Sequence, residues 1–372
     1  MNDPLENLQA HVTNQLPLGD ARSCASMCGI VGGNPSKGAK SPELWRAAYD
    51  ALQLDAVYLP FDVAPSELAD FVSGLRAVPN FRGMSVTVPH KESIVSCLDA
   101  LDPLAERIGA TNCVVREQDG RLVGYNTDAE GAVASLLRPG LEGQSPVFED
   151  LSGLRFVLLG SGGAAKAVAH AMAQAMGAGH LCITNRHATV GRRLATRVAE
   201  ENPGVEARFV EGDALGGALS EADLVVNATA VGQGGTLGTG RQVTSLEPYS
   251  ALAPAQPVAV EAAPAMSETK VLAEVFRESL DDIVENRRRG MATIRQLPAS
   301  AVVLDIVYRP LETVMLRHAR WAGLRCIDGR AMNVLQAVEA FHTRVMNGVL
   351  QEKDQATAET YASVASAMAA CW

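Results

Sequence analysis

The sequence predicts an α/β protein with two domains, and three observations lead to this prediction. The first is a strand, a glycine turn, a helix and a second strand in succession over residues 155–186. The second is a series of short apolar runs that alternate with helical patterns along most of the 372 residues. Such alternation is typical of sheets covered by helices. The third is a stretch rich in Gly, Pro and Gln at 139–149, which marks a domain boundary.

Composition and charge exclude several classes of protein. A hydrophobic content of 47% with 20% charged residues is ordinary for a soluble globular chain. The net charge of −10 argues against a nucleic-acid surface, and no apolar stretch is long enough to span a bilayer. Residues 1–26 lack the basic start and apolar middle of a signal peptide. The seven scattered cysteines have no zinc-type spacing, so we expect reduced thiols, a cytoplasmic protein and no metal site.

The first domain is expected over residues 27–138. Before it, residues 1–26 form an extension that either contains one amphipathic helix at 5–16 or is a mobile segment. A helix begins at Ser41, which we expect to be its N-cap because Pro42 and Glu43 follow. The alternation of apolar and turn residues predicts strands at 27–32, 56–61, 84–88, 113–116 and 122–124, and further helices at 66–75, 102–109 and 129–137.

The second domain is expected over residues 150–328. Strands are predicted at 155–159, 180–184, 207–210, 223–228, 302–306 and 324–327, with helices at 164–176 and 311–322. Residues 233–300 contain one clear helix at 267–289 whose apolar face comprises Val271, Val275, Phe276, Leu280, Ile283 and Val284. Residues 329–372 return to the first domain, with helices at 331–346 and 351–372.

The glycine turn at 160–163 indicates a dinucleotide site of the Rossmann type. Glycines allow the backbone to approach a pyrophosphate, and the N-terminus of the following helix offers free N–H groups. We expect contacts from Gly160, Gly162, Gly163 and Ala164. The second strand ends in Asn185 and Arg186, where an acidic residue would indicate NAD. A guanidinium can instead bind a 2′-phosphate, so we predict NADP; the alternative is an ordinary surface arginine.

Polar residues also follow strands of the first domain. Thr87 and Lys91 lie at the end of the run 84–88, which Pro89 stops, and Asp128 follows the run 122–124. In α/β sheets the carboxyl ends of strands present the groups that bind ligands. A lysine at a helix start or an aspartate cap is common, but the two together favour a site.

Several stretches in order along the chain resemble the shikimate dehydrogenase family and its quinate-using relatives. They include SVTVPHK (85–91), GATNCVV (109–115), GYNTD (124–128), LGSGGAAKAV (159–168), ITNR (183–186), NATAVG (227–232), DIVYRP (305–310) and DGRAMNVLQAVEAF (328–341). The resemblance implies a Rossmann-type NADP-binding domain, an α/β substrate-binding domain, a cleft between them and a place in aromatic amino acid biosynthesis. It also implies a monomer or homodimer that acts on a small cyclic hydroxy acid.

The resemblance assigns roles to individual residues. Lys91 and Asp128 would be catalytic and handle the proton during hydride transfer. Substrate contacts would come from Ser41, Thr87, Asn112, Tyr308 and Gln336, and cofactor contacts from the glycine-turn residues, Asn185, Arg186, Thr229 and Gly329.

The chain also departs from the family pattern. The family loop reads Ser-x-Ser-Pro, but here Ala39 precedes Ser41, so one hydroxyl for the substrate carboxylate is missing. Lys37 or Lys40 could hold that carboxylate instead, or the substrate could be quinate or a modified ring acid. Val190 stands where a second basic residue is usual, and residues 1–26 and most of 233–300 have no counterpart. These departures leave a second hypothesis, a nicotinamide-binding regulatory protein that has lost turnover.

Overall fold

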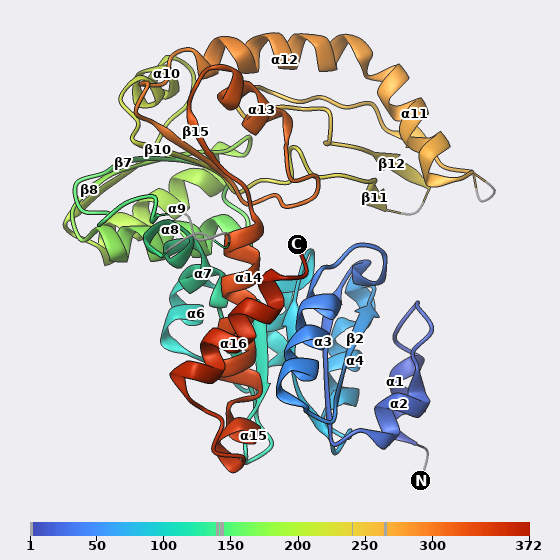
Figure 1. Cartoon of the computed structure of the whole chain (residues 1–372). Coiled ribbons are helices and arrows are strands. Elements are labelled where there is room, and N and C mark those ends of the chain that lie inside the picture. The colour runs from blue at the N-terminus through green and yellow to red at the C-terminus, as the bar shows by residue number, and fades with distance from the viewer. Residues whose placement is uncertain (1–2, 139–140, 142–144, 240, 264–265) are drawn as a thin grey trace. The chain divides into compact units, whose positions relative to one another are not determined.

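The computed structural model describes residues 3–138, 141, 145–239, 241–263 and 266–372. Contacts divide the chain into a first unit, Met1–Val147 with Ala331–Trp372, and a second unit, Phe148–Arg330 (Figure 1). Part of the linker expected at 139–149 lies outside the described residues. Within the described residues, no helix has both the length and the apolar character needed to cross a bilayer.

A six-stranded mixed sheet forms the centre of the first unit, in the order β2-β1-β3-β5-β6-β4. β1 pairs in parallel with β2 and β3, whereas β5 is antiparallel to β3 and β6. All seven residues of β1 are buried, as expected for a central strand covered on both faces. The strands are β1 (Ser26–Gly32), β2 (Ala56–Asp62), β3 (Phe81–Val86), β4 (Ala100–Leu101), β5 (Cys113–Arg116) and β6 (Leu122–Tyr125).

Helices cover both faces of this sheet and form two hydrophobic clusters. One cluster contains Phe71 and Leu75 of α4, and the other contains Trp45 of α3 with Phe341. Trp45 stacks on Tyr58 of β2 at a centroid distance of 4.6 Å. The helices are α3 (Ser41–Leu52), α4 (Leu68–Leu75), α5 (His90–Ser93), α6 (Pro103–Ile108), α7 (Thr127–Leu137), α14 (Arg330–Val338), α15 (Asn347–Glu352) and α16 (Ala358–Ala369).

Two local predictions for the first unit are wrong, and a third element is helical as expected but differs in its hydrogen-bond pattern. The helix expected at 5–16 is replaced by α1 (Pro4–Gln9) and α2 (Leu18–Ser23), whose connecting turn still buries Val12 and Leu16. Ser41 does not cap α3, because Lys40 occupies the cap position and no side chain bonds the free N–H groups. The helix expected at 331–346 becomes π-helical over Glu339–Val345, where Val345 packs on Gly83 of β3.

The second unit contains a six-stranded parallel sheet in the order β15-β14-β10-β7-β8-β9. Counted along the chain this is the order of a Rossmann fold, with β7 as its first strand. Its strands are β7 (Arg155–Leu159), β8 (Gly179–Thr184), β9 (Val205–Phe209), β10 (Leu224–Asn227), β14 (Val302–Asp305) and β15 (Arg325–Ile327). Its helices are α8 (Gly163–Met176), α9 (Ala188–Glu201), α10 (Asp213–Ser220) and α13 (Val314–Trp321).

The stretch 233–300 forms an addition to the Rossmann sheet. Strands β11 (Leu237–Thr239), β12 (Gln242–Thr244) and β13 (Val260–Glu261) make a small antiparallel sheet on which α11 (Glu268–Glu278) packs. The single helix predicted at 267–289 is wrong, because α11 ends before Ser279 and α12 runs over Leu280–Ile294. Ser279 is buried and accepts a hydrogen bond from the Val258 amide at 2.9 Å. After this break Leu280 and Val284 are exposed and do not continue the apolar face.

Candidate active site

Lys91 and Asp128 lie side by side in the first unit. Lys91 is in α5, directly after β3, and Asp128 is in the first turn of α7, directly after β6. The Lys91 Nζ atom is 2.5 Å from Asp128 Oδ2, and the two side chains are 16% and 9% exposed. Both charges lose hydration when they are sheltered from water. Their mutual attraction must therefore be supplemented by further hydrogen bonds.

Asn112 supplies much of the remaining support. Its Nδ2 atom lies 2.8 Å from Asp128 Oδ1, 3.0 Å from Thr127 Oγ1 and 3.2 Å from Gln336 Oε1. Its Oδ1 atom accepts a hydrogen bond from the Thr127 amide at 2.7 Å. The fold therefore brings together four residues that the sequence nominated, from α5, the start of β5, α7 and α14. Gln336 joins them from the far end of the chain, which sequence spacing alone does not reveal.

Ser41 and Thr87 follow two neighbouring parallel strands, β1 and β3, and so lie at the same edge of the sheet. Ser41 is buried close to the Tyr58 phenol. Burial raises the pKa of Tyr58 well above its usual range, and hydrogen bonds with Ser85 and Ser41 oppose that shift. The Thr87 amide donates to the Val31 carbonyl at 2.9 Å. The Thr87 methyl group occupies the space that a Cβ on Gly32 would need.

The glycine turn of the second unit has the geometry required of a phosphate-binding loop. Gly160 has a φ of 117°, and a Cβ there would lie 2.9 Å from the Ala228 carbonyl oxygen. Gly162 is the N-cap of α8, no side chain bonds that helix end, and open space surrounds the position of its missing Cβ. Gly163 and Ala164 are the first residues of α8. The N–H groups of this helix end can therefore receive an anion.

Asn185 and Arg186 follow β8 beside this turn. The Asn185 Nδ2 atom donates to Ser161 Oγ at 2.5 Å, which joins the two loops. Arg186 is exposed, and no residue in the described part of the chain forms a hydrogen bond or ion pair with its guanidinium. Arg192, by contrast, pairs with Glu211 at 2.7 Å and stacks on the Phe209 ring. Arg186 is thus one of the cations among the described residues of this region that are free to meet a phosphate.

A buried carboxyl group, which the sequence analysis did not single out, organises the loops after β10 and β14. Asp305 is fully buried and accepts hydrogen bonds from Asn227 Nδ2 at 2.9 Å, the Val307 amide at 3.0 Å and Thr313 Oγ1 at 2.7 Å. Asn227 Oδ1 in turn accepts from Thr229 Oγ1 at 2.7 Å. The network therefore holds Thr229 in place and also fixes the loop that carries Tyr308. The sequence signal that could have identified this residue is a carboxyl group at the end of an apolar strand, in VVLD (302–305).

Gly329 lies directly against this loop. A Cβ on Gly329 would be 2.4 Å from the Ile306 carbonyl oxygen, so a larger residue would displace the backbone. Tyr308 is half-buried in the second unit, beyond the end of β14. Its role in substrate binding, like the roles of Thr229 and Gly329 in cofactor binding, stays a prediction.

Burial raises the pKa of Asp305 to about 7, although its three hydrogen-bond donors favour the ionised form. Between its unfolded value near 4 and about 7, the folded protein binds a proton that the unfolded chain has released. We therefore expect this group's contribution to stability to be lost as the pH rises from about 4 through about 7. Asp305→Asn should flatten the pH dependence of the urea-unfolding midpoint over that range. Identical pH profiles for the variant and the wild type would contradict the shifted pKa.

Comparison with known proteins agrees with the motifs. Residues 31–114 match the model of the shikimate dehydrogenase substrate binding domain, and residues 144–242 match the model of shikimate / quinate 5-dehydrogenase. A shikimate dehydrogenase (NADP(+)) of Moorella thermoacetica is 36% identical over 310 residues, which cover 83% of this chain and 84% of that protein.

Solved structures show the same similarity. Shikimate 5-dehydrogenase of Thermus thermophilus, in complex with NADP(H) and shikimate, has a TM-score of 0.60 and 26% identity over 89% of this chain and all of that one. The ligand-free 5-ketofructose reductase of a Gluconobacter strain has a TM-score of 0.62 and 25% identity over 94% of this chain and 99% of that one.

Proposed function

The chain belongs to the shikimate dehydrogenase family, and we propose that it reduces the carbonyl of a ring acid of the 3-dehydroshikimate or 3-dehydroquinate type. It is an NADP-dependent oxidoreductase, as its relatives are. When bound, NADPH supplies the hydride that reduces the carbonyl carbon. The N-terminus of α8 and Arg186 would hold its phosphates, because both offer unpaired donors to an anion.

The observation that carries this proposal is the sheltered contact between Lys91 and Asp128. Hydride addition to a carbonyl carbon leaves negative charge on the oxygen, which must receive a proton. We propose that the Lys91 ammonium lies against this oxygen, stabilises the developing charge and donates the proton. Asp128 keeps the ammonium oriented at 2.5 Å, and Asn112 holds the other carboxylate oxygen. In the oxidative direction the same atoms move in reverse.

A substrate panel tests the function. Purified protein is mixed with NADPH and, separately, with 3-dehydroshikimate, 3-dehydroquinate and 5-ketofructose, and loss of NADPH absorbance is followed. We expect turnover with a ring acid. The ketose is included because the Gluconobacter neighbour is named for it and it carries no carboxylate. NADPH binding without turnover of any of these would favour the regulatory hypothesis.

The loop before Ser41 bears on the choice of substrate. Lys40, one candidate for the substrate carboxylate, is already occupied, because it pairs with Glu43 and lies 5.0 Å from the centroid of the Trp372 ring. Ala39 packs against the same hydrophobic cluster as Trp372. Ser41 therefore offers one hydroxyl where the family has two, and the neighbouring ammonium is engaged elsewhere.

Ala39→Ser should restore the missing hydroxyl and raise the preference for shikimate over quinate. One hydrogen bond to a charged group contributes about 1.5–3 kcal/mol, which corresponds to roughly ten- to a hundredfold in the ratio of specificity constants. The measurement is kcat/KM for shikimate and quinate with NADP, in the wild type and the variant. An unchanged ratio would mean that this loop does not contact the carboxylate, and the assignment of Ser41 to substrate binding would fall with it.

A further inference from the structure

The N-terminal segment, defined as residues 3–24, completes the outer edge of the first sheet. β2 is an edge strand, so its outward N–H and C=O groups need partners. The Asn14 Nδ2 atom donates to the Pro60 carbonyl at 3.0 Å, and Asn14 Oδ1 accepts from the Asp62 amide at 2.8 Å. The Thr13 amide donates to the Asp62 carbonyl at 2.9 Å. The segment thus holds the last residues of β2 as a further strand would.

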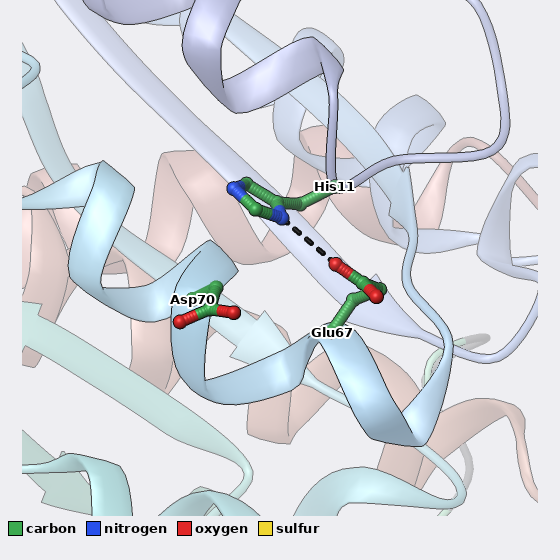
Figure 2. Close-up of side chains that lie close together, drawn as sticks. All are labelled: His11, Glu67 and Asp70. Atoms are coloured by element: carbon green, nitrogen blue, oxygen red, sulfur yellow. Dashed lines mark hydrogen bonds and ion pairs between the residues drawn. The ribbon is translucent and has the colours of Figure 1, made fainter.

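Apolar and ionic contacts anchor the segment. Leu5, Leu8 and Val12 are buried in the same cluster as Phe71 of α4. Figure 2 shows His11 directed at Glu67, with His11 Nδ1 and Glu67 Oε2 2.9 Å apart. Asp70 lies nearby, but all three side chains are partly or fully exposed. The hydrogen bond to Glu67 is sufficient to explain the position of the His11 ring. We therefore attribute this group to docking, and the segment is an integral part of the first unit.

Asp62 connects this edge to the substrate loop, defined as residues 33–40. The Asp62 carboxylate is buried and accepts hydrogen bonds from the Ser36 amide at 2.8 Å and from the Ser36 hydroxyl. Ser36 lies in the short helical turn Pro35–Lys37, just before α3 begins at Ser41. This hydrogen bonding is one of several restraints on a largely exposed loop, in which Pro35 is buried and the Gly33 amide donates to the Val88 carbonyl at 3.0 Å.

The next residue of the chain extends the connection to the catalytic lysine. The Val63 amide donates to the Gly32 carbonyl at 2.9 Å, and the Val63 carbonyl accepts from His90 Nε2 at 2.8 Å. His90 is buried and immediately precedes Lys91. The end of β2 is therefore bonded both to the loop before Ser41 and to the turn before Lys91.

We propose that Asn14 and Asp62 are positioning residues for the substrate. Asn14 fixes the backbone of Asp62, and the Asp62 carboxylate then fixes Ser36 and with it the place of Ser41. The assignment rests on the proposed function only in taking Ser41 as a substrate contact. Neither residue touches the reacting atoms, so the effect is on geometry and on substrate binding rather than on the chemical step.

Hydrogen exchange tests the structural link without any substrate. In the full-length protein, Asn14→Ala should speed exchange of the Ser36 amide, because its acceptor becomes less well placed. Asn80→Ala is the matched control, since Asn80 Nδ2 holds the same segment by the carbonyls of Ala21 and Cys24 at 2.9 and 3.0 Å. The control should leave Ser36 exchange unchanged. Equal exchange of Ser36 in the wild type and Asn14→Ala would overturn the proposal.

Kinetics test the consequence for the substrate. Asn14→Ala and Ser36→Ala should each raise KM for the ring ketone about two- to tenfold, the range for one lost hydrogen bond, and leave KM for NADPH unchanged. Because both act through Asp62, the double variant should fall short of the product of the two effects. An equal rise in both KM values, or the same rise in Asn80→Ala, would indicate general loosening and refute the proposal. If the wild-type protein shows no turnover, the proposed function is refuted. Hydrogen exchange of the Ser36 amide would still decide whether Asn14 positions Ser36 through Asp62.

Discussion

Lys91→Ala should lower kcat by about 10²–10⁴, the usual contribution of a positioned proton donor, while the affinity for NADPH changes little. The ammonium is directed at Asp128 in the first unit, whereas the residues assigned to the cofactor belong to the second unit. Its removal therefore takes away the proton and the charge stabilisation but no cofactor contact. The measurement is single-turnover reduction at saturating ring ketone and NADPH.

Two controls make this result interpretable. Lys91→Ala leaves the Asp128 carboxylate sheltered without its partner, which is destabilising, so thermal unfolding is measured alongside the rates. Lys353→Ala removes an exposed lysine of the same unit and should behave as the wild type. If the folded Lys91→Ala enzyme keeps a rate within a few-fold of the wild type at saturation, Lys91 does not donate the proton.

Arg186→Ala should weaken NADPH binding about ten- to a hundredfold and leave NADH binding nearly unchanged. Only NADPH carries a 2′-phosphate, and charge-assisted hydrogen bonds to such a group contribute about 1.5–3 kcal/mol. The usual second basic residue is Val190 in this chain, so Arg186 should account for most of the discrimination. Dissociation constants for both nucleotides are measured by fluorescence titration.

The neighbouring arginines provide matched comparisons. Arg192→Ala should have little effect on either nucleotide, because Arg192 is engaged by Glu211 and Phe209. Arg193 is exposed on the same helix, and a larger loss in Arg193→Ala than in Arg186→Ala would move the phosphate site to that residue. Equal losses for NADPH and NADH in Arg186→Ala would show that the arginine does not recognise the 2′-phosphate.

The sequence was sufficient for features that depend on local periodicity and on glycine. Short apolar runs that alternate with helical patterns predicted the strands of both sheets except the two-residue β4, and the turn at Gly160 predicted the Rossmann order that β7 to β15 adopt. Gly160 was predicted from the glycine turn and Gly329 from the family resemblance, and in the structure a Cβ at either position would meet neighbouring backbone. The polar residues after β3 and β6 were predicted to meet, because strand ends share one edge of a sheet.

Other features depend on partners that are distant in the sequence. Periodicity predicted one helix at 267–289, but it does not reveal that Ser279 bonds the Val258 amide and that one helix ends there before a second begins. The Asp305 network links the loops after β10 and β14, and nothing near Asp305 in the chain reveals Asn227 or Thr313 as its partners.

The N-terminal segment combines a feature that local sequence predicts with one that depends on distant partners. Its sequence determined an apolar pattern, with Leu5, Leu8, Val12 and Leu16 spaced as on a buried face. The sequence does not show that this pattern covers α4 or that Asn14 completes the edge of β2, because both depend on contacts formed in the folded chain. The physical reason is that an amide side chain bonds whichever backbone groups the fold leaves unpaired, and an edge strand becomes an edge only after the whole sheet has been assembled.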